Sequence, residues 1–496
     1  MARPAGVRGD HVGGGRGGGG AVARRPRERP RAGGAVRRHD RHSLPGPAIS
    51  PGRCMQGRSL RDRRGRGVQV RLAAERRRDL LHRAPDAGRE LRASCARRAA
   101  GRGGRGGCGG CARRGRAGGR ASRARVTAGA VGIGIVGYGL MGKAHAFGYT
   151  AAPVMRRLRH RPSLRIISGR DRERVAAAAE SYGVAGWTED WRELVNRDDV
   201  DIVDICTPPG THAEIAAAAA AAGKAVICEK PLAVSYSQAA SAVEAVTRAK
   251  VLNAVGFNYR RLPAVSLMKR MVDEGAVGQV RLVRSAWLSD EFVDPAIPFD
   301  WRFDRAMGGT TIADLGSHMI DMATWIAGPI VAVSGQSATF VRERSGRPVT
   351  VDDASAAMVE FASGARGVVE MARVAVRRPC DFTLEVNGDR GTLAFDYARL
   401  NELRFGDGAD RVELYGMRRI RAEQQSHPYA RDWWPVGQGV GYGSSFVNHL
   451  GDLLDRWPDG PWEPDFAQGA AVQAVCDAIE LSAAERRWVA VSEITG

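Results

Sequence analysis

The sequence predicts an α/β protein in which a parallel, doubly wound sheet is followed by a β-rich α+β part, behind a long extension that forms no packed core. Three observations predict this order. The first quarter is made largely of Arg and Gly, the next segment alternates short apolar runs with helix-forming stretches, and later runs alternate apolar and polar residues. The predicted boundaries are 1–127 for the extension, 128–257 for the first domain and 258–496 for the second.

Charge sets the extension apart from the rest of the chain. The chain has 496 residues and a formal net charge of +21, yet residues 1–125 hold 34 Arg, no Lys and 8 Asp or Glu, which leaves a net charge of −5 for 126–496. The same segment has no Phe, Trp or Tyr, so it cannot bury enough apolar surface to offset the entropy of ordering it. We therefore expect a disordered extension.

Three interpretations of this extension are open. An Arg- and Gly-rich tail can bind phosphates non-specifically, it can be a solvated disordered segment, or it can be an upstream or out-of-frame stretch of a GC-rich gene. The absence of aromatic residues, on which nucleic-acid bases stack, disfavours the first interpretation. We favour the third and expect no nucleic-acid partner for the folded part.

Composition also disfavours several protein classes. No run of 18 or more apolar residues exists, so no membrane-spanning helix is predicted. Arg24-Arg25 is not followed by an apolar segment, which disfavours a secretion signal. Cys108 and Cys111 have no second pair of ligands nearby, so no metal site is predicted. We expect reduced thiols in a cytoplasmic enzyme.

The first domain begins with a glycine-rich turn. The apolar run 132–136 is typical of a buried parallel strand, and 143–149 is predicted to be a helix. In the intervening GxGxxG pattern, the first glycine permits a tight turn, the second lets backbone approach a pyrophosphate, and the third packs helix on strand. The helix amides then receive the pyrophosphate. The predicted dinucleotide contacts are Gly137, Gly139, Leu140, Met141 and Gly142.

The next predicted strand, 164–168, ends where the adenosine ribose should lie. An acidic residue there accepts both ribose hydroxyls and repels a 2′-phosphate. This chain has Gly169-Arg170 instead, with Asp171 one residue later. Arg170 favours NADP because a guanidinium pairs with a 2′-phosphate, whereas an Asp171 that still reaches the ribose favours NAD. Both cofactors stay open, and we slightly favour NADP.

Two further predicted strands, 200–206 and 225–228, end in polar turns. Open parallel sheets bind ligands at the carboxyl ends of their strands, so these turns are candidates for cofactor contacts. Lys230, directly after the second strand, is also placed for chemistry. The cofactor contacts predicted in the two turns are Thr207, Pro208, His212, Glu229 and Lys230.

The second domain is predicted to be rich in β-strands. The alternating runs lie at 280–286, 356–361, 367–374, 383–386 and 392–395, and 387–391 is a hairpin turn signal. One helix, 313–326, interrupts them. Asp314, His318 and Asp321 fall at positions i, i+4 and i+7 of that helix, so we expect them to share one face.

Five motifs together resemble the Gfo/Idh/MocA oxidoreductases and occur in that family's order. They are 137–142, Thr207-Pro208 with His212, Glu229-Lys230-Pro231, 256–264 and 314–318. Residues 141–145, 257–264 and Trp434-Pro435 with Gly441-Tyr442 are most similar to the levoglucosan and inositol dehydrogenases. The resemblance implies a Rossmann domain and an α+β domain whose open, mostly antiparallel sheet covers the substrate and often forms the oligomer interface. We therefore expect a homodimer or homotetramer.

The resemblance also implies an activity. This is the NAD(P)-dependent oxidation of a ring hydroxyl of a cyclic polyol, sugar or anhydrosugar to a ketone, with the family's catalytic Lys, Asp and His at Lys230, Asp314 and His318. Our hypothesis is that His318 is the general base, Asp314 binds substrate or tunes the imidazole, and Lys230 lowers the pKa of the hydroxyl. The predicted substrate contacts are Tyr259, Arg260, Trp301, Asp314 and His318.

Two alternatives to this activity stay open. The first is an oxidoreductase that keeps NADP tightly bound and shuttles hydride between two sugars. The second is a non-catalytic nucleotide-binding or RNA-binding protein.

Overall fold

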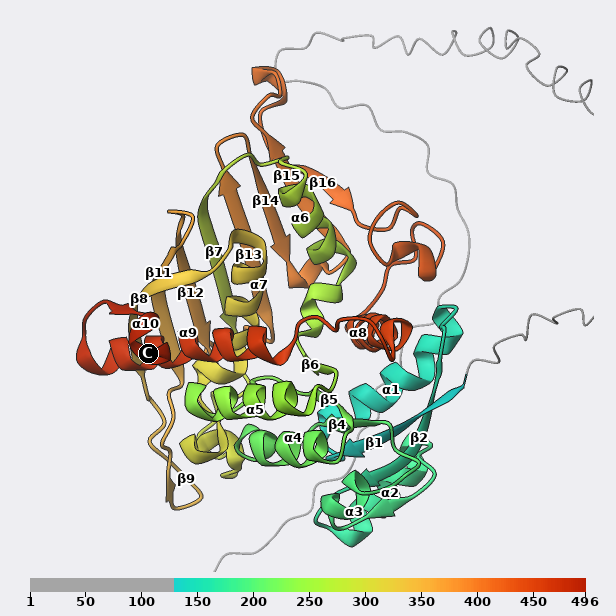
Figure 1. The fold of residues 1–496 in the computed structure, drawn as a ribbon. Coiled ribbons are helices and arrows are strands. Elements are labelled where there is room, and N and C mark those ends of the chain that lie inside the picture. Colours follow the sequence, from blue (N-terminus) through green and yellow to red (C-terminus); the bar gives the residue numbers. More distant parts are fainter. Residues whose placement is uncertain (1–128) are drawn as a thin grey trace, which may run out of the picture. The chain divides into compact units, whose positions relative to one another are not determined.

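A computed structural model describes residues 129–496 of the chain (Figure 1). The predicted extension at 1–127 and the pair Cys108 and Cys111 lie outside the described residues. The structure describes the first predicted domain from its first strand onward and the second predicted domain in full.

The first part is a six-stranded parallel sheet, which confirms the predicted Rossmann-type fold. The strand order is β3-β2-β1-β4-β5-β6, with the chain crossing from one half of the sheet to the other after β3. The strands are β1 (Ala130–Val136), β2 (Arg161–Ser168), β3 (Trp187–Thr188), β4 (Ile202–Ile205), β5 (Ala225–Cys228) and β6 (Asn253–Val255). The central strands β4 and β5 are buried along their whole length, as expected for a sheet that is covered on both sides.

Helices cover both faces of this sheet. One face packs against α1 (Leu140–Met155), α2 (Arg172–Tyr182) and α8 (Gly443–Arg456), and the other against α3 (Trp191–Val195), α4 (His212–Ala221) and α5 (Tyr236–Ala249). Alternate residues of β1 enter the two cores, since Ile133 and Ile135 belong to one and Val136 to the other. Helix α8 comes from the C-terminal part of the chain, so the two parts share a core.

The second part is a nine-stranded mixed sheet in the order β16-β15-β14-β13-β7-β12-β11-β8-β17. Only β7 and β12 pair in parallel within it, which confirms the mostly antiparallel prediction. The predicted hairpin turn joins β13 to β14, where Asn387 pairs with Thr392. The strands are β7 (Val280–Leu288), β8 (Ile330–Ala338), β11 (Ala354–Phe361), β12 (Arg366–Ala372), β13 (Asp381–Gly388), β14 (Gly391–Asp396), β15 (Glu402–Asp407), β16 (Arg418–Arg421) and β17 (Val489–Ala490); β9 (Glu343–Arg344) and β10 (Arg347–Pro348) form a separate pair.

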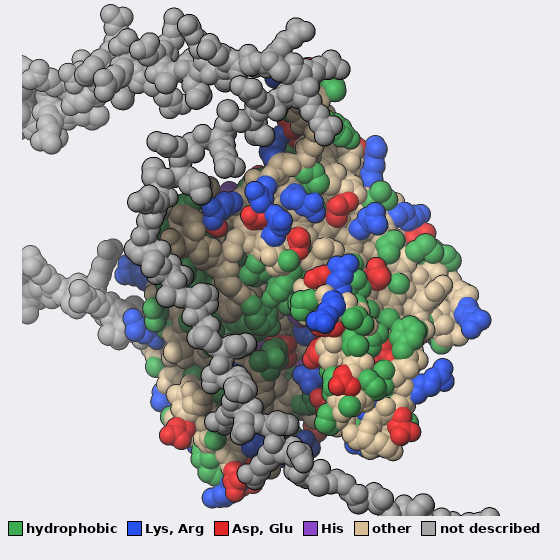
Figure 2. Space-filling model, turned by 180° about the vertical axis from the view of Figure 1, so that it is seen from behind, with side chains coloured by type: hydrophobic (Ala, Val, Ile, Leu, Met, Phe, Trp, Pro, Cys, Tyr) green, Lys and Arg blue, Asp and Glu red, His purple; other side chains and the backbone are tan. Residues whose placement is uncertain are grey.

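Among residues 129–496, helices pack on one face of the mixed sheet and none packs on the other. Helices α6 (Pro263–Asp273), α7 (Ser317–Ala327) and α9 (Phe466–Glu485) lie against its strands in Figure 1, and the short α10 (Ser492–Thr495) ends the chain. Seen from the opposite side, hydrophobic side chains are interspersed with charged ones on the surface (Figure 2). The covered face therefore supplies the core.

The predicted helix 313–326 is two segments rather than one. A π-helical turn at Ile312–Gly316 precedes α7. Such a turn holds more residues than an α-helical turn, so it rotates Asp314 relative to the residues that follow. The expectation that Asp314 and Asp321 share one face is therefore wrong.

The two parts are tightly joined. Helix α9 packs against both α5 and β8, and one hydrophobic cluster runs from β4 through β5 to the mixed sheet. The described residues lie within one compact unit, so the boundary between 257 and 258 stays a prediction. Among residues 129–496, no helix combines the length and the apolar composition that crossing a membrane requires.

Candidate active site

A cavity of about 810 Å³ lies where the carboxyl ends of the parallel strands meet the mixed sheet. Its volume is in the range of small-molecule and cofactor sites. Four predicted site residues, Gly142, Asp171, His212 and Arg260, do not line it. The predicted residues that do are Gly137, Gly139, Leu140, Met141, Arg170, Thr207, Pro208, Glu229, Lys230, Tyr259, Trp301, Asp314 and His318.

The glycine-rich turn has the geometry that a pyrophosphate needs. Gly137 has φ of +109°, and a Cβ there would lie 2.7 Å from the Cys206 carbonyl oxygen. A Cβ on Gly139 would have no protein atom within 4 Å, so the backbone beside the cavity is open to a ligand. Helix α1 has no side-chain cap, which leaves its first amides free to bind an anion. These residues fit the pyrophosphate of a nicotinamide dinucleotide.

Gly142 contributes packing rather than a cofactor contact. A Cβ on Gly142 would lie 2.1 Å from the Gly137 carbonyl oxygen, inside van der Waals contact. The third glycine therefore lets α1 approach the turn, and its place among the predicted cofactor contacts is corrected.

Two arginines, one after β2 and one in the first turn of α2, line the cavity. They are Arg170 and Arg174, and Glu189 also lines it. Asp171 instead caps α2, because its Oδ1 accepts a hydrogen bond from the Arg174 backbone N–H at 3.0 Å. The structure therefore does not place Asp171 at the cavity as a cofactor contact.

Lys230 and Asp314 form an ion pair across the cavity between the two parts of the chain. The Lys230 Nζ donates to Asp314 Oδ1 at 3.0 Å and to the Asp314 carbonyl oxygen at 2.8 Å. The other carboxylate oxygen lies 3.8 Å from Nη1 of the fully buried Arg373. Burial alone raises the pKa of Asp314, but Lys230 and then Arg373 outweigh it and hold that pKa well below its ordinary value. Asp314 is therefore an anion at neutral pH.

His318 lines the same cavity as a neutral imidazole. Burial lowers its pKa well below the ordinary value of 6.5, and the nearby Lys230 lowers it further, against the opposing effect of Asp314. Its Nδ1 is buried without a hydrogen-bond partner among residues 129–496. The ring stacks on Trp287, with ring centres 5.6 Å apart, and meets the edge of Tyr259 at 4.6 Å. Aromatic packing thus fixes the ring beside the Lys230–Asp314 pair.

Aromatic side chains form the opposite end of the cavity. Tyr259 lies in an aromatic cluster with Trp287 and Tyr442, and all three line the cavity. Trp301 also lines it, with the Arg302 guanidinium 4.6 Å from its ring centre. Flat apolar faces beside charged groups suit a polyhydroxylated ring.

Two predicted contacts are directed elsewhere. The Arg260 guanidinium is buried against Asp321, with Nε and Nη2 at 2.9 and 2.5 Å from its carboxylate oxygens, and Nη1 donates to Gln468. His212 is fully buried, and its ring nitrogens lie 2.9 and 2.8 Å from the carbonyl oxygens of Pro231 and Thr207. Arg260 therefore joins α7 and α9, and His212 ties together the two polar turns, so the structure places neither side chain at the cavity.

Sequence analysis missed several residues at the site. Arg373 follows β12 and Glu291 lies three residues after β7, where the reasoning that selected Lys230 at a strand end could have found them. Burial, followed by the repulsion of Asp314, raises the pKa of Glu291. No comparable pattern marks Arg174 in α2, Trp287 in β7 or Tyr442 before α8. A residue of each type is also common at such a position in ordinary packing.

Comparisons with known proteins agree with this geometry. Residues 131–257 match the model of an oxidoreductase family with an NAD-binding Rossmann fold, and 265–394 match the GFO/IDH/MocA C-terminal domain. Levoglucosan dehydrogenase of Pseudarthrobacter phenanthrenivorans is 37% identical over 387 residues, covering 73% of this chain and 98% of the relative. Inositol 2-dehydrogenase of Rhizobium meliloti is 27% identical over 73% of this chain and 99% of its own length.

A solved structure extends the likeness to three dimensions. Levoglucosan dehydrogenase in complex with NADH and levoglucosan superposes with a TM-score of 0.72 at 38% identity, over 73% of this chain and 99% of that chain. The chain therefore belongs to the Gfo/Idh/MocA family and is an NAD(P)-dependent oxidoreductase that acts on CH–OH groups.

Proposed function

We propose that this protein oxidises a ring hydroxyl of a cyclic polyol, sugar or anhydrosugar to a ketone. The observation that carries the proposal is that the Lys230–Asp314 pair and a neutral His318 line the same cavity as the glycine-rich turn. Relatives named levoglucosan dehydrogenase and inositol 2-dehydrogenase support a cyclic polyhydroxylated substrate.

His318 is the general base of the proposed reaction. Because its imidazole is neutral at pH 7, it can accept the hydroxyl proton while the carbon loses hydride. The Lys230 ammonium stabilises the negative charge that develops on the oxygen, and Asp314 holds that ammonium at 3.0 Å. The hydride would pass to the nicotinamide of a dinucleotide held at the glycine-rich turn, and His318 would take up the hydroxyl proton as the ketone forms.

We further propose that the protein accepts NADP as well as NAD. The family model and the NADH complex of the relative support NAD. Arg170 after β2 and Arg174 in the first turn of α2 line the cavity, while Asp171 caps α2 and its Oδ2 lies 3.4 Å from Nε of Arg174. Two guanidiniums can pair with a 2′-phosphate, so Arg170→Ala should raise KM for NADP about tenfold and leave KM for NAD within about twofold. Equal changes for both cofactors would refute this assignment.

Tyr259 and Trp301 are the proposed substrate contacts, together with Asp314 and His318. Tyr259 is buried next to the His318 ring, and Trp301 presents a partly exposed face to the cavity. Both residues belong to the second part of the chain, which the family resemblance implies covers the substrate. A Trp301→Ala variant should raise substrate KM more than it lowers kcat.

The uncovered face of the mixed sheet is the proposed contact between copies of the chain. Leu282, Val331, Met358 and Val368 project from its strands with between 42% and 52% of their surface exposed. Exposed apolar side chains among charged ones, such as Arg284 and Glu370 on the same face, are typical of an interface. We propose a homodimer or homotetramer, which light scattering of the wild type and of a Met358→Asp variant would test. The cytoplasmic location stays a prediction.

The experiment that tests the function is a substrate screen. Inositols, hexoses and levoglucosan are offered with NAD and with NADP, and the absorbance of the reduced nicotinamide is followed. We expect turnover of at least one of these ring alcohols, and no turnover of any would overturn the proposal. If reduced or oxidised NADP instead co-purifies with the protein, and turnover requires two sugars, the sugar–sugar oxidoreductase is favoured. The RNA-binding alternative rests on residues outside the described part of the chain.

A further inference from the structure

A buried ionic network lies beneath the candidate active site, and its centre is His145. This residue lies on α1, the helix that begins at the glycine-rich turn, close to its N-terminus, and 1% of its surface is exposed. Its Nδ1 lies 3.0 and 2.8 Å from the two carboxylate oxygens of Asp204, at the end of β4. Its Nε2 lies 2.9 Å from Oε1 of Glu229, which follows β5. The imidazole therefore joins three elements of the nucleotide-binding part.

The contacts of the two carboxylates indicate that His145 is an imidazolium. Asp204 Oδ2 also accepts a hydrogen bond from the Tyr149 hydroxyl at 2.9 Å, and Glu229 Oε2 accepts one from the Lys230 backbone N–H at 3.0 Å. An ionised carboxylate can only accept hydrogen bonds, and His145 faces a carboxylate with each ring nitrogen, so both nitrogens must donate. Burial raises the pKa of Glu229, but His145 outweighs it and lowers that pKa below the ordinary value. Although burial opposes the charge, Asp204 raises the pKa of His145 well above its ordinary value.

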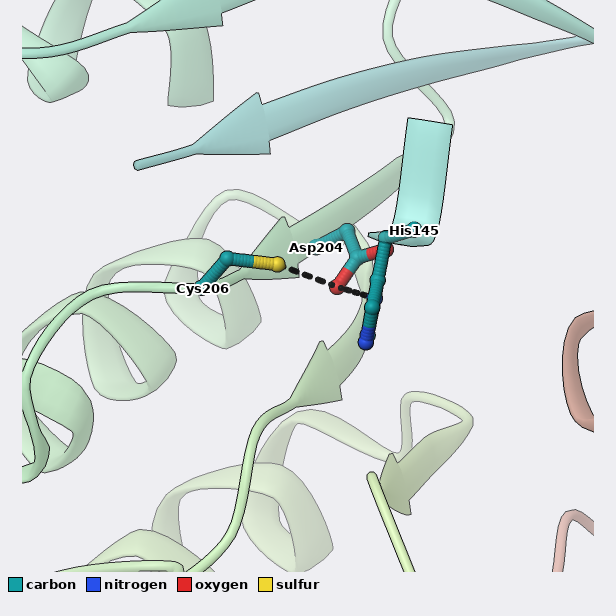
Figure 3. A group of neighbouring side chains, drawn as sticks. All are labelled: His145, Asp204 and Cys206. Carbon is teal, nitrogen blue, oxygen red and sulfur yellow. Dashed lines mark hydrogen bonds and ion pairs between the residues drawn. The ribbon is translucent and has the colours of Figure 1, made fainter. Parts of the chain in front are cut away.

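This network is not arranged as a metal site. His145, Asp204 and Cys206 lie close enough together to suggest one (Figure 3). However, a metal ligand needs a free lone pair on nitrogen, and both ring nitrogens of His145 face carboxylates. Burial and then Asp204 raise the pKa of the Cys206 thiol to about 12, so it donates weakly to Asp204 rather than binding a metal as a thiolate.

The network ends at the backbone of Lys230. Glu229 is fixed by His145 on one oxygen and holds the Lys230 N–H with the other. Gly256 closes the remaining side, because a Cβ there would lie 2.8 Å from Glu229 Oε1. The carboxylate is thus confined between a cation, a backbone amide and a glycine, and the Lys230 side chain leaves from that point toward Asp314 at 3.0 Å.

We propose that His145 is a positioning residue for Lys230, acting through the Glu229 carboxylate. Because His145 also belongs to the helix that begins at the glycine-rich turn, the same imidazole fixes the cofactor-binding turn and the catalytic ammonium relative to each other. This inference rests on the proposed function of Lys230. It predicts that loss of His145 releases the Lys230 ammonium from Asp314 while the cavity and its other residues persist.

Site-specific acetylation tests this position without a substrate. The full chain is treated with a trace of acetic anhydride, and the rate at each of its five lysines is read by peptide mass spectrometry. A lysine amine that is held by an anionic partner is shielded from the reagent, so its release makes it react faster. In His145→Gln, Lys230 should react about fivefold to tenfold faster, whereas the rates at Lys224, Lys250 and Lys269 should not change. An unchanged rate at Lys230 in folded His145→Gln would overturn the proposal.

Two further variants separate positioning from general stability. Tyr149→Phe removes a hydrogen bond from Asp204 at the far side of the network but leaves the His145–Glu229–Lys230 contacts intact, so Lys230 labelling and kcat should stay at the wild-type level. Gly256→Ala pushes on Glu229 without changing any charge, and should raise Lys230 labelling as His145→Gln does. If His145→Gln does not fold, Gly256→Ala still tests the link from Glu229 to Lys230 through which His145 is proposed to act, and unchanged Lys230 labelling in that variant would overturn the proposal. Equal effects of Tyr149→Phe and His145→Gln would also overturn the proposal.

Kinetics complete the test. With levoglucosan and NAD, His145→Gln should lower kcat about tenfold to hundredfold, since a misplaced catalytic group costs this much, while the Kd for NADH changes less than about threefold. A wild-type protein that binds NADH but oxidises neither levoglucosan nor the other sugars would count against the proposed function. In that case the labelling of Lys230 still decides the positioning of His145.

Discussion

Replacing Asp314 by Asn is the most informative single change at the site. The substitution keeps the shape of the side chain but removes the charge that accepts the Lys230 ammonium at 3.0 Å and faces Arg373 at 3.8 Å. Two cations then remain beside a neutral His318 with no anion between them. We expect the ammonium to move away from the reacting oxygen, so turnover falls.

The size of the effect follows from the ion pair. Coulomb's law at 3.0 Å with an effective dielectric constant of about 20 gives about 5.5 kcal/mol as an upper figure. The side chains of Lys230 and Asp314 are 12% and 24% exposed, which reduces the expected loss to about 2–3 kcal/mol. If that loss falls on the transition state, kcat decreases about 30-fold to 150-fold.

Steady-state kinetics and cofactor titration measure the outcome. For Asp314→Asn we expect the lowered kcat with NAD and the best ring alcohol of the substrate screen, and a Kd for NADH within about threefold of wild type, because Asp314 is not part of the glycine-rich turn. Since Asp314 raises the pKa of His318, its loss should also move the acid limb of the pH profile to lower pH.

Asp321→Asn is the matched control. Asp321 lies seven residues farther along the chain and pairs with Arg260, with both side chains almost fully buried. Removing its charge should cost about 3–5 kcal/mol of stability but leave kcat of the folded enzyme within about threefold. A normal kcat for Asp314→Asn, or an equal loss of kcat in both variants, would refute the electrostatic reasoning.

Three other predictions follow from the same geometry. His318→Phe should lower kcat about 10²-fold to 10⁴-fold at unchanged NADH affinity. Because the pKa of His318 is lowered, the wild-type kcat/KM for oxidation should fall only below pH 6.5, and an acid limb above pH 6.5 would contradict this. The pKa of His145 is raised in the folded protein, so the stabilisation that its charge gives the fold is fully present below pH 6.5 and is lost as pH rises through the raised value. Urea unfolding should therefore show the largest destabilisation of His145→Gln in acid. A larger difference between variant and wild type in alkali would be inconsistent with an imidazolium. Gly139→Ala should leave the Tm of the cofactor-free protein unchanged and weaken NADH binding about tenfold, since its Cβ meets no protein atom within 4 Å; normal NADH affinity would remove the turn from the cofactor site.

Much of the fold could be predicted because its signals are local. The buried run before Gly137 and the glycine spacing predict a strand, a turn and a helix within a few residues, and 225–228 was predicted with its observed bounds. The β-rich part was predicted from alternation, which marks a sheet with one uncovered face. Helix α9 gave no such pattern, because it is buried by α5 on one side and β8 on another.

The errors at the site have physical causes that sequence spacing does not carry. Helical spacing put Asp321 beside Asp314, but the π-helical turn at Ile312–Gly316 separates them, and Asp321 then pairs with Arg260. The contact of Lys230 with Asp314 joins residues 84 positions apart. The role of His145 was likewise invisible, since both of its carboxylate partners come from later strands. Such contacts depend on how the elements pack.

The central claim is that Lys230 and His318 act on one alcohol carbon in front of the nicotinamide. A crystal structure of the full chain with NADH and levoglucosan, or with the best substrate of the screen, measures this directly. We predict one substrate hydroxyl within about 3 Å of both the Lys230 Nζ and a His318 ring nitrogen, with its carbon facing the nicotinamide. A substrate whose hydroxyls contact only one of the two side chains, or whose nearest carbon is turned away from the cofactor, would contradict the account.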